Sequence, residues 1–151
     1  MQPKEIAKEI IENNMHMTLA TCDGQDPWVA PVFYAVDQKY NLYFASALDS
    51  VHAQHIGKNP HVAVAIFEAE GRGVQIKTIC SLVDEKDYAR VMEYFQKKLF
   101  PDEEERAKHP IDTKKYSGTN RRIFKCVPSK VYVLDSDPHV QDRRLEVQWV
   151  D

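Results

Sequence analysis

The chain has 151 residues, a length typical of a single domain, and we expect one domain over residues 1–151. Hydrophobic residues make up 43% of the chain and aromatic residues 10%, which is enough to bury a core and argues against a disordered protein. The 20 lysines and arginines are outnumbered by 23 aspartates and glutamates, so the formal net charge is -3. Because no positive field attracts phosphates, nucleic acid is not an expected partner.

The cysteines and the N-terminus favour a protein of a reducing compartment. Cys22, Cys80 and Cys126 lack the spacing of a disulfide framework or a zinc motif, so we expect free thiols that are mostly buried. The first residues are rich in acidic side chains and do not resemble a secretory signal. No stretch is apolar for long enough to cross a bilayer. We therefore expect a cytoplasmic protein with no membrane partner.

Apolar spacing in the first third of the chain predicts a helix followed by strands. Isoleucines at helical spacing predict an amphipathic helix over 3–13. Alternating residues predict strands over 16–22 and 28–36, joined into a hairpin by the turn at Asp23-Gly24. A further β-rich run over 40–46 is expected to extend the hairpin as a third consecutive antiparallel strand.

The middle of the chain predicts a short helix between strands. The segment 50–59 begins with a capping serine and stops at Asn59-Pro60, because proline disfavours helical geometry in the residue before it. The run 61–67 is almost continuously apolar, which predicts a strand covered on both faces. A strand over 74–83 is expected to turn Val74, Ile76 and Thr78 one way and the intervening residues the other.

The last third predicts the clearest helix and a return to strands. Apolar residues at spacings of three and four predict an amphipathic helix over 85–99. The polar segment 100–117 predicts an exposed loop or a short helical excursion. Strands are expected over 123–127, 130–134 and 145–150, the first two separated by Pro128-Ser129. About seven short strands with two inserted helices favour an α+β fold, mainly antiparallel, built as a closed or nearly closed barrel.

An extended pattern within residues 16–67 is more specific than these periodicities. It contains a strand ending in Pro31-Val32-Phe33-Tyr34, a strand ending in Ala45-Ser46, a helix opened by Ser50-Val51-His52, and Asn59-Pro60 before an apolar strand. The pattern continues through the strand that holds Gln75 and resembles the flavin mononucleotide (FMN)-binding split-barrel family related to pyridoxamine 5'-phosphate oxidase. This resemblance implies a Greek-key split β-barrel with flanking helices, in a homodimer that holds FMN in a groove at the subunit interface.

The resemblance also implies which residues contact the cofactor. The expected set is Pro31, Val32, Phe33, Tyr34, Ala45, Ser46, Ser50, Val51, His52 and Gln75. The backbone of 31–34 would line the isoalloxazine ring, and Gln75 would add a side-chain amide. Ser46, Ser50 and His52 would hold the phosphate, since hydroxyls, a cation and a helix N-terminus suit a dianion. His52 stands where many family members carry lysine or arginine, so binding should depend on pH.

Two interpretations of the activity remain open. In one, the protein is a flavin-dependent oxidoreductase that uses a small-molecule electron donor or acceptor and needs no dedicated catalytic side chain. In the other, the groove holds flavin or haem without catalysis. Pyridoxamine 5'-phosphate oxidase activity itself is not expected, because the basic strand motif of those enzymes is missing from 29–34 and the surroundings of Arg143-Arg144 do not match their C-terminal region.

Other charged residues give weaker signals. His52, His55 and His61 lack partners at zinc-ligand spacing, so no metal site is expected. The pairs Lys114-Lys115 and Arg121-Arg122 are interpreted as solvated surface, although either could attract an anion.

Overall fold

The computed structural model describes residues 1–134, 139 and 143–149. Its strands are β1 (His16–Cys22), β2 (Pro27–Phe33), β3 (Ala35–Val36), β4 (Leu42–Ala47), β5 (His61–Phe67), β6 (Gly73–Leu82), β7 (Arg121–Leu134) and β8 (Arg144–Val147). Its α-helices are α1 (Pro3–Asn13), α2 (Val51–Lys58), α3 (Tyr88–Leu99) and α4 (Glu103–Ala107), and short 3-10 turns span Ala69–Gly71, Glu85–Asp87 and Thr113–Lys115.

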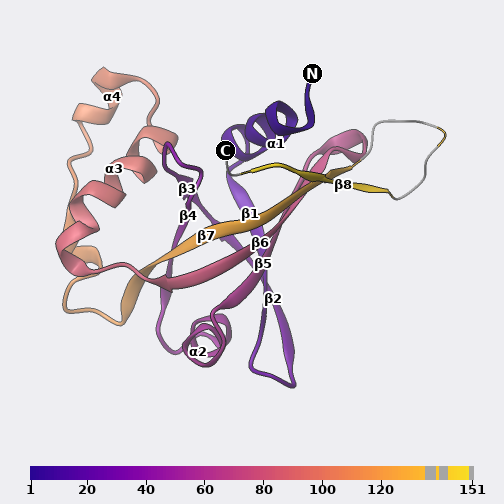
Figure 1. The fold of residues 1–151 in the computed structure, drawn as a ribbon. Helices are drawn as coiled ribbons and strands as arrows, with labels where there is room; N and C mark the ends of the chain where they lie inside the picture. The colour runs from indigo at the N-terminus through magenta and orange to yellow at the C-terminus, as the bar shows by residue number, and fades with distance from the viewer. Residues whose placement is uncertain (135–138, 140–142, 150–151) are drawn as a thin grey trace.

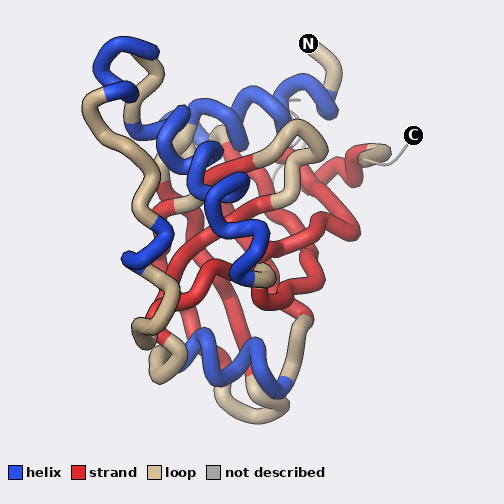
Figure 2. Tube along the Cα trace, turned by 90° about the vertical axis from the view of Figure 1, so that its left-hand side faces the viewer, coloured by secondary structure: helices blue, strands red, loops and turns tan. Residues whose placement is uncertain are grey.

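The strands form one curled antiparallel sheet with helices around it. The strand order is β2-β1-β5-β6-β7-β4-β3, and β8 pairs with β7 on the edge opposite β6. In Figure 1, α1 lies at one end of the sheet next to β8, α2 lies at the opposite end near β2, and α3 and α4 lie beside β3, β4 and β7. Figure 2 shows α2 again at the end opposite α1. The expected α+β, mainly antiparallel architecture is therefore confirmed.

One face of the sheet carries the main hydrophobic core. Ile10 and Ile11 of α1 pack with Leu19, Val64 and Ile76, all of them buried. A second core lies under α3 and includes Tyr43, Tyr88, Val91 and Ile123. Within the described residues, no helix has the length and hydropathy needed to cross a membrane.

The prediction that 61–67 is covered on both faces was wrong for the isolated chain. Residues of β5 alternate, with Val62, Val64 and Ile66 buried and Ala63 and Ala65 exposed. The main core covers one face of β5, whereas α3 covers the other face of the sheet only over β4 and β7, so the small apolar residues on the outer face of β5 remain open to solvent. By contrast, the alternation predicted for β6 is confirmed.

The predicted third strand of the hairpin was also wrong in its pairing. The run 28–36 is divided at Tyr34, so that β2 pairs with β1, while β3 and β7 are the neighbours of β4. The Tyr34 side chain is fully buried, and its hydroxyl donates a hydrogen bond of 2.5 Å to the carbonyl oxygen of Ile11 in α1. This hydrogen bond lies where the chain passes from β2, at one edge of the sheet, to β3, at the other edge.

Pro128-Ser129 does not separate two strands, because β7 runs continuously through it. The register with β6 shifts there: Lys77 is opposite Lys130 and Thr78 is opposite Pro128, which leaves Ser129 as an extra residue. Its hydroxyl donates to the carbonyl of Lys77 at 3.0 Å. Such a bulge accommodates a proline and changes which residues face inward. At the C-terminal end, β8 covers part of the predicted strand, and Val150 lies outside the described residues.

Lys98 of α3 places an amine in an apolar setting. Its Nζ is buried without a hydrogen-bond partner in the described part of the chain, 3.3 Å from the centroid of the Tyr34 ring and 5.7 Å from that of Phe33. Burial lowers the pKa of Lys98 from 10.5 to about 8. The folded state therefore disfavours the charge, and this cost is complete below pH 8 and disappears as the pH rises toward 10.5.

Lys98→Met should therefore stabilise the protein. We expect the free energy of unfolding at pH 7 to rise by about 1–2 kcal/mol, a value reduced for partial solvent exposure and cation–π attraction. The gain should shrink at about pH 9.5, where Lys98 is mostly neutral in the folded state. Urea denaturation at both pH values measures it, with the exposed neighbour Lys97→Met as the control. An equal gain for both variants, or a gain independent of pH, would contradict the assignment.

Candidate functional site

The residues predicted to hold a phosphate meet at the N-terminus of α2. Ser46 lies near the end of β4, Ser50 caps the helix and His52 is in its first turn. The Ser46 hydroxyl is 2.6 Å from Nε2 of His52 and 3.2 Å from the Ser50 hydroxyl. Three groups that can donate to an anion thus converge, and in the absence of one they satisfy each other.

The helix start adds backbone donors to this cluster. Oγ of Ser50 accepts from the backbone N–H of Ala53 and donates to the carbonyl of Ala47 at 2.7 Å. The other first-turn N–H groups of a helix have no partner within the helix, and the helix dipole favours negative charge there. The carboxylate of Asp49, next to the capping serine, accepts from the side chain of Asn120 at 2.9 Å.

A buried contact fixes α2 on the sheet. Nδ1 of His55 lies 3.0 Å from Oγ1 of Thr21 on β1, and both side chains are buried. On its other side, Nε2 of His55 is 4.0 Å from the carboxylate of Asp23. Backbone N–H groups of Asp26 and Gln25 hold the pKa of Asp23 below its usual range, so this carboxylate stays charged. The helix that presents Ser50 and His52 is therefore fastened to β1.

The environment of His52 favours its neutral form when no anion is bound. Burial lowers its pKa, and the charge of His55 lowers it further. The ring also packs near Phe44, with centroids 6.0 Å apart. A phosphate beside this ring would have the opposite effect, because a negative charge stabilises the imidazolium.

The structure places Arg122 beside the cluster of Ser46, Ser50 and His52, although its sequence context predicted solvated surface. In the β4–β7 pairing Ser46 lies opposite Arg122 and Ala47 lies opposite Arg121, so adjacent arginines project to opposite faces of the sheet. Nη1 of Arg122 donates to backbone carbonyls near the start of β7, which leaves further guanidinium donors available. Arg121 instead lies 5.6 Å from the ring centroid of Tyr116. Only the long-range register distinguishes the two, and no local signal reveals it.

The residues expected to line the flavin ring have different surroundings. Pro31 is exposed, Val32 and Phe33 are half-buried, and Tyr34 is in the core with its N–H bonded to the carbonyl of Met15. Phe33 packs against His16 and Phe95. Strand β2 contacts both β4 and α2. Pro31–Phe33 therefore belong to a strand next to Ser46, Ser50 and His52, the anion cluster. The side chain of Tyr34 is not available to a ligand in this arrangement.

The other two apolar members of the predicted set lie on the elements that form the cluster. Ala45 packs on the second core under α3, and Val51 is 43% exposed in the first turn of α2.

Gln75 lies apart from the anion cluster within one chain. It is opposite Tyr132 on β7, whereas Ser46 is opposite Arg122, and these positions are up to about 33 Å apart along an extended strand. Gln75 accepts a 2.7 Å hydrogen bond from Nε of Arg144 on the exposed face of the sheet. A surface cavity of about 560 Å³ there has a floor of small residues. Gln75 is therefore not part of the cluster of Ser46, Ser50 and His52 within one chain.

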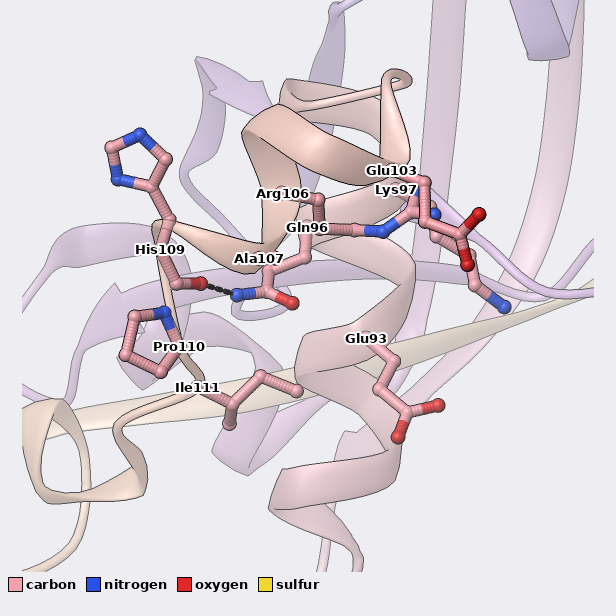
Figure 3. A pocket seen from close by; sticks show the side chains of 9 residues that line it. All are labelled: Glu93, Gln96, Lys97, Glu103, Arg106, Ala107, His109, Pro110 and Ile111. Atoms are coloured by element: carbon pink, nitrogen blue, oxygen red, sulfur yellow. Dashed lines mark hydrogen bonds between the residues drawn. The ribbon is translucent and has the colours of Figure 1, made fainter.

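A second depression, of about 400 Å³, lies between α3 and the α4 segment (Figure 3). The side chain of Gln96 donates to the carbonyl of His109, and the His109 ring stacks on Phe100 at 4.1 Å. This depression is lined by both acidic and basic side chains and by none of the predicted cofactor residues. Its lining residues are Glu93, Gln96, Lys97, Glu103, Arg106, Ala107, His109, Pro110 and Ile111.

Comparisons with known proteins agree with this architecture. Residues 3–134 match the family model described as pyridoxamine 5'-phosphate oxidase. Comparison with curated protein sequences gives no match. Among solved structures, a Listeria innocua protein with a provisional assignment as a pyridoxamine 5'-phosphate oxidase shows 23% identity and a TM-score of 0.67, covering 88% of this chain and 98% of its own.

Two further solved structures carry cofactor names. An FAD-binding protein from Mesorhizobium loti shows 16% identity and a TM-score of 0.60, with 83% of this chain and 88% of that chain covered. A heme binding protein from Mycobacterium smegmatis shows 16% identity and a TM-score of 0.69, with 99% of this chain and 60% of that chain covered. At these identities the similarities establish the fold alone. Because the family model spans most of the chain and the folds agree, the chain belongs to the pyridoxamine 5'-phosphate oxidase family and has its split-barrel fold.

Proposed function

We propose that the chain binds FMN and acts as a small flavin-dependent oxidoreductase in a homodimer. The observation that carries the proposal is the convergence of Ser46, Ser50 and His52 at the start of α2, with Arg122 on the adjoining strand. Family membership supports a flavin as the phosphorylated ligand.

The donors fit the phosphate of FMN in number and type. The Ser46 hydroxyl and the first-turn N–H groups would donate to phosphate oxygens, and the Ser50 hydroxyl would do so by turning from the carbonyl of Ala47. Arg122 would supply a permanent positive charge. His52 adds a titratable charge, and a bound dianion raises its pKa from the lowered value of the free protein. Affinity for FMN should therefore increase as the pH falls, while Arg122 keeps part of the attraction at every pH.

The isoalloxazine ring would lie along β2. Backbone groups of Pro31–Phe33 offer regularly spaced donors and acceptors to its polar edge, and Val51 gives an apolar contact beside the phosphate cluster. Ala45 would contribute backbone groups alone, because its side chain packs in the second core. Gln75 would contact the ring from the second subunit, because in its own chain it lies ten positions farther along β7 than the cluster.

The proposed dimer interface is the exposed face of the sheet. Val29 is 61% exposed and Phe67 is 75% exposed, and between them Ala20, Ala63 and Ala65 form a floor of small residues. Side chains this small let a second sheet approach closely, and exposed apolar patches commonly mark interfaces. A second copy on this face would bring Gln75 toward the flavin site of its neighbour.

The flavin, when bound, supplies hydride or electron transfer. The protein would then bind and orient the ring and exclude water, so no side chain must act as an acid or base. Non-catalytic binding of flavin or haem is the alternative.

An absorption spectrum after addition of FMN and gel filtration tests the proposal. We expect a retained two-band flavin spectrum near one FMN per subunit, and oxidation of a reduced nicotinamide faster than free FMN supports. Combining Ser46→Ala and His52→Ala should abolish retention while the circular dichroism spectrum is unchanged. Loss of all flavin from the unmodified protein would reject the cofactor, and binding without faster oxidation would favour the non-catalytic alternative.

Arg122→Gln tests the phosphate assignment against a matched neighbour. We expect affinity for FMN to fall by about 10- to 100-fold, because one charge-assisted hydrogen bond is lost. Arg121→Gln removes the same charge from the opposite face and should leave affinity within about 2-fold. Fluorescence titration with FMN and with riboflavin, which lacks the phosphate, measures both. Equal losses for the two variants would show that only net charge matters.

Ala65→Arg tests the proposed interface. A long cation in the floor of small residues should prevent the second sheet from approaching, so light scattering should show a monomer and flavin should be released. The control, Ala89→Arg, places the same side chain on the exposed side of α3 and should remain a dimer. Dimers from both variants would place the interface elsewhere.

A further inference from the structure

Two buried cysteines lie directly opposite each other on neighbouring strands. Cys80 of β6 pairs with Cys126 of β7, and the two side chains are 2% and 0% exposed in the main core. Both side chains belong to the same cluster of buried residues. Cys22 is separate, on β1 and only half-buried.

The backbone shows which type of cross-strand pair this is. The N–H of Cys80 donates to the carbonyl of Pro60 at 2.8 Å, on the β5 side of β6. Because N–H and C=O of one strand residue point the same way, Cys80 makes no ladder bonds toward β7. It therefore forms a non-hydrogen-bonded pair with Cys126, in which Cα atoms are typically about 4.5 Å apart. That separation is within the range of disulfides, about 4.4–6.8 Å.

We propose that Cys80 and Cys126 are a disulfide-forming pair, oxidised by small neutral hydroperoxides such as hydrogen peroxide. One thiolate attacks a peroxide oxygen, the O–O bond breaks, and a sulfenic acid and water form after protonation. The second thiol attacks the sulfenic sulfur, an S–S bond forms and a second water leaves. The two thiols lose two electrons and two protons, and one peroxide is reduced to two waters.

Burial determines which oxidants can act. The hydrogen bond with Cys126 and burial raise the pKa of the Cys80 thiol, so little thiolate is present and the reaction is slow. Hydrogen peroxide is small and uncharged and can reach the core during local opening, whereas a bulky charged disulfide reagent cannot. Once one sulfur is oxidised, its neighbour is already in place, so the disulfide forms in preference to further oxidation.

The bond would link the two ends of a long excursion of the chain. The segment between Cys80 and Cys126 contains α3 and α4 and leads to Arg122. Cross-linking its ends removes conformational entropy from the unfolded state. We expect the Tm of the oxidised protein to rise by roughly 5–10 °C.

Peptide mapping tests the proposal in a Cys22→Ser background, which removes the accessible thiol. The reduced protein is treated with hydrogen peroxide, denatured, alkylated and digested with trypsin without reductant. We expect a cross-linked species that joins residues 78–86 to residues 126–130 and disappears on reduction. A parallel treatment with a bulky aromatic disulfide should leave both thiols free in the folded protein. Two alkylated thiols after peroxide treatment, or a link between different molecules, would overturn the proposal.

Cys126→Ala in the same background is the matched control. It should gain neither the cross-link nor the higher Tm. If this variant does not fold, the Tm of the Cys22→Ser protein before and after oxidation, and again after reduction, gives the same comparison. An unchanged Tm despite a complete cross-link would contradict the expected constraint on the unfolded chain.

Discussion

The long strand β7 is the element on which the remaining structure depends. It pairs with β6 along most of one edge, and on its other edge with β4 near its start and β8 near its end, so it connects both cores. Its register sets Arg122 opposite Ser46 and Tyr132 opposite Gln75. These two pairs lie near opposite ends of the same strand, which is why the anion cluster and the exposed sheet face are separate regions of one subunit.

The sequence predicted local elements well because their signals are local. The helix over 3–13, the helix after the turn at Glu85–Asp87 and the strands β1, β5 and β6 follow from periodicity and capping within about ten residues. Capping by Ser50 is also a local property. The predicted cluster of Ser46, Ser50 and His52 is accordingly brought together by the fold.

Features that depend on distant pairing could not be predicted from the sequence. Arg121 and Arg122 are identical residues in adjacent positions, and only the register with β4 separates their environments. The solvent exposure of Ala63 and Ala65 likewise depends on where the helices pack. Gln75 lies apart from the cluster because β7 is one long strand that pairs with both regions. The sequence predicted two strands there, because the pattern of inward residues changes phase at Pro128-Ser129.

The bulge at Ser129 has a consequence for how the chain tolerates insertion and deletion. On β6 the inward positions alternate without interruption, whereas on β7 they change from even-numbered residues such as Phe124 to odd-numbered residues such as Val131. The extra residue is therefore what allows both halves of β7 to face the core. Removing one residue here would turn one half of the strand inside out. Chain length at this point is thus constrained as strictly as residue type, although the segment is exposed at its centre.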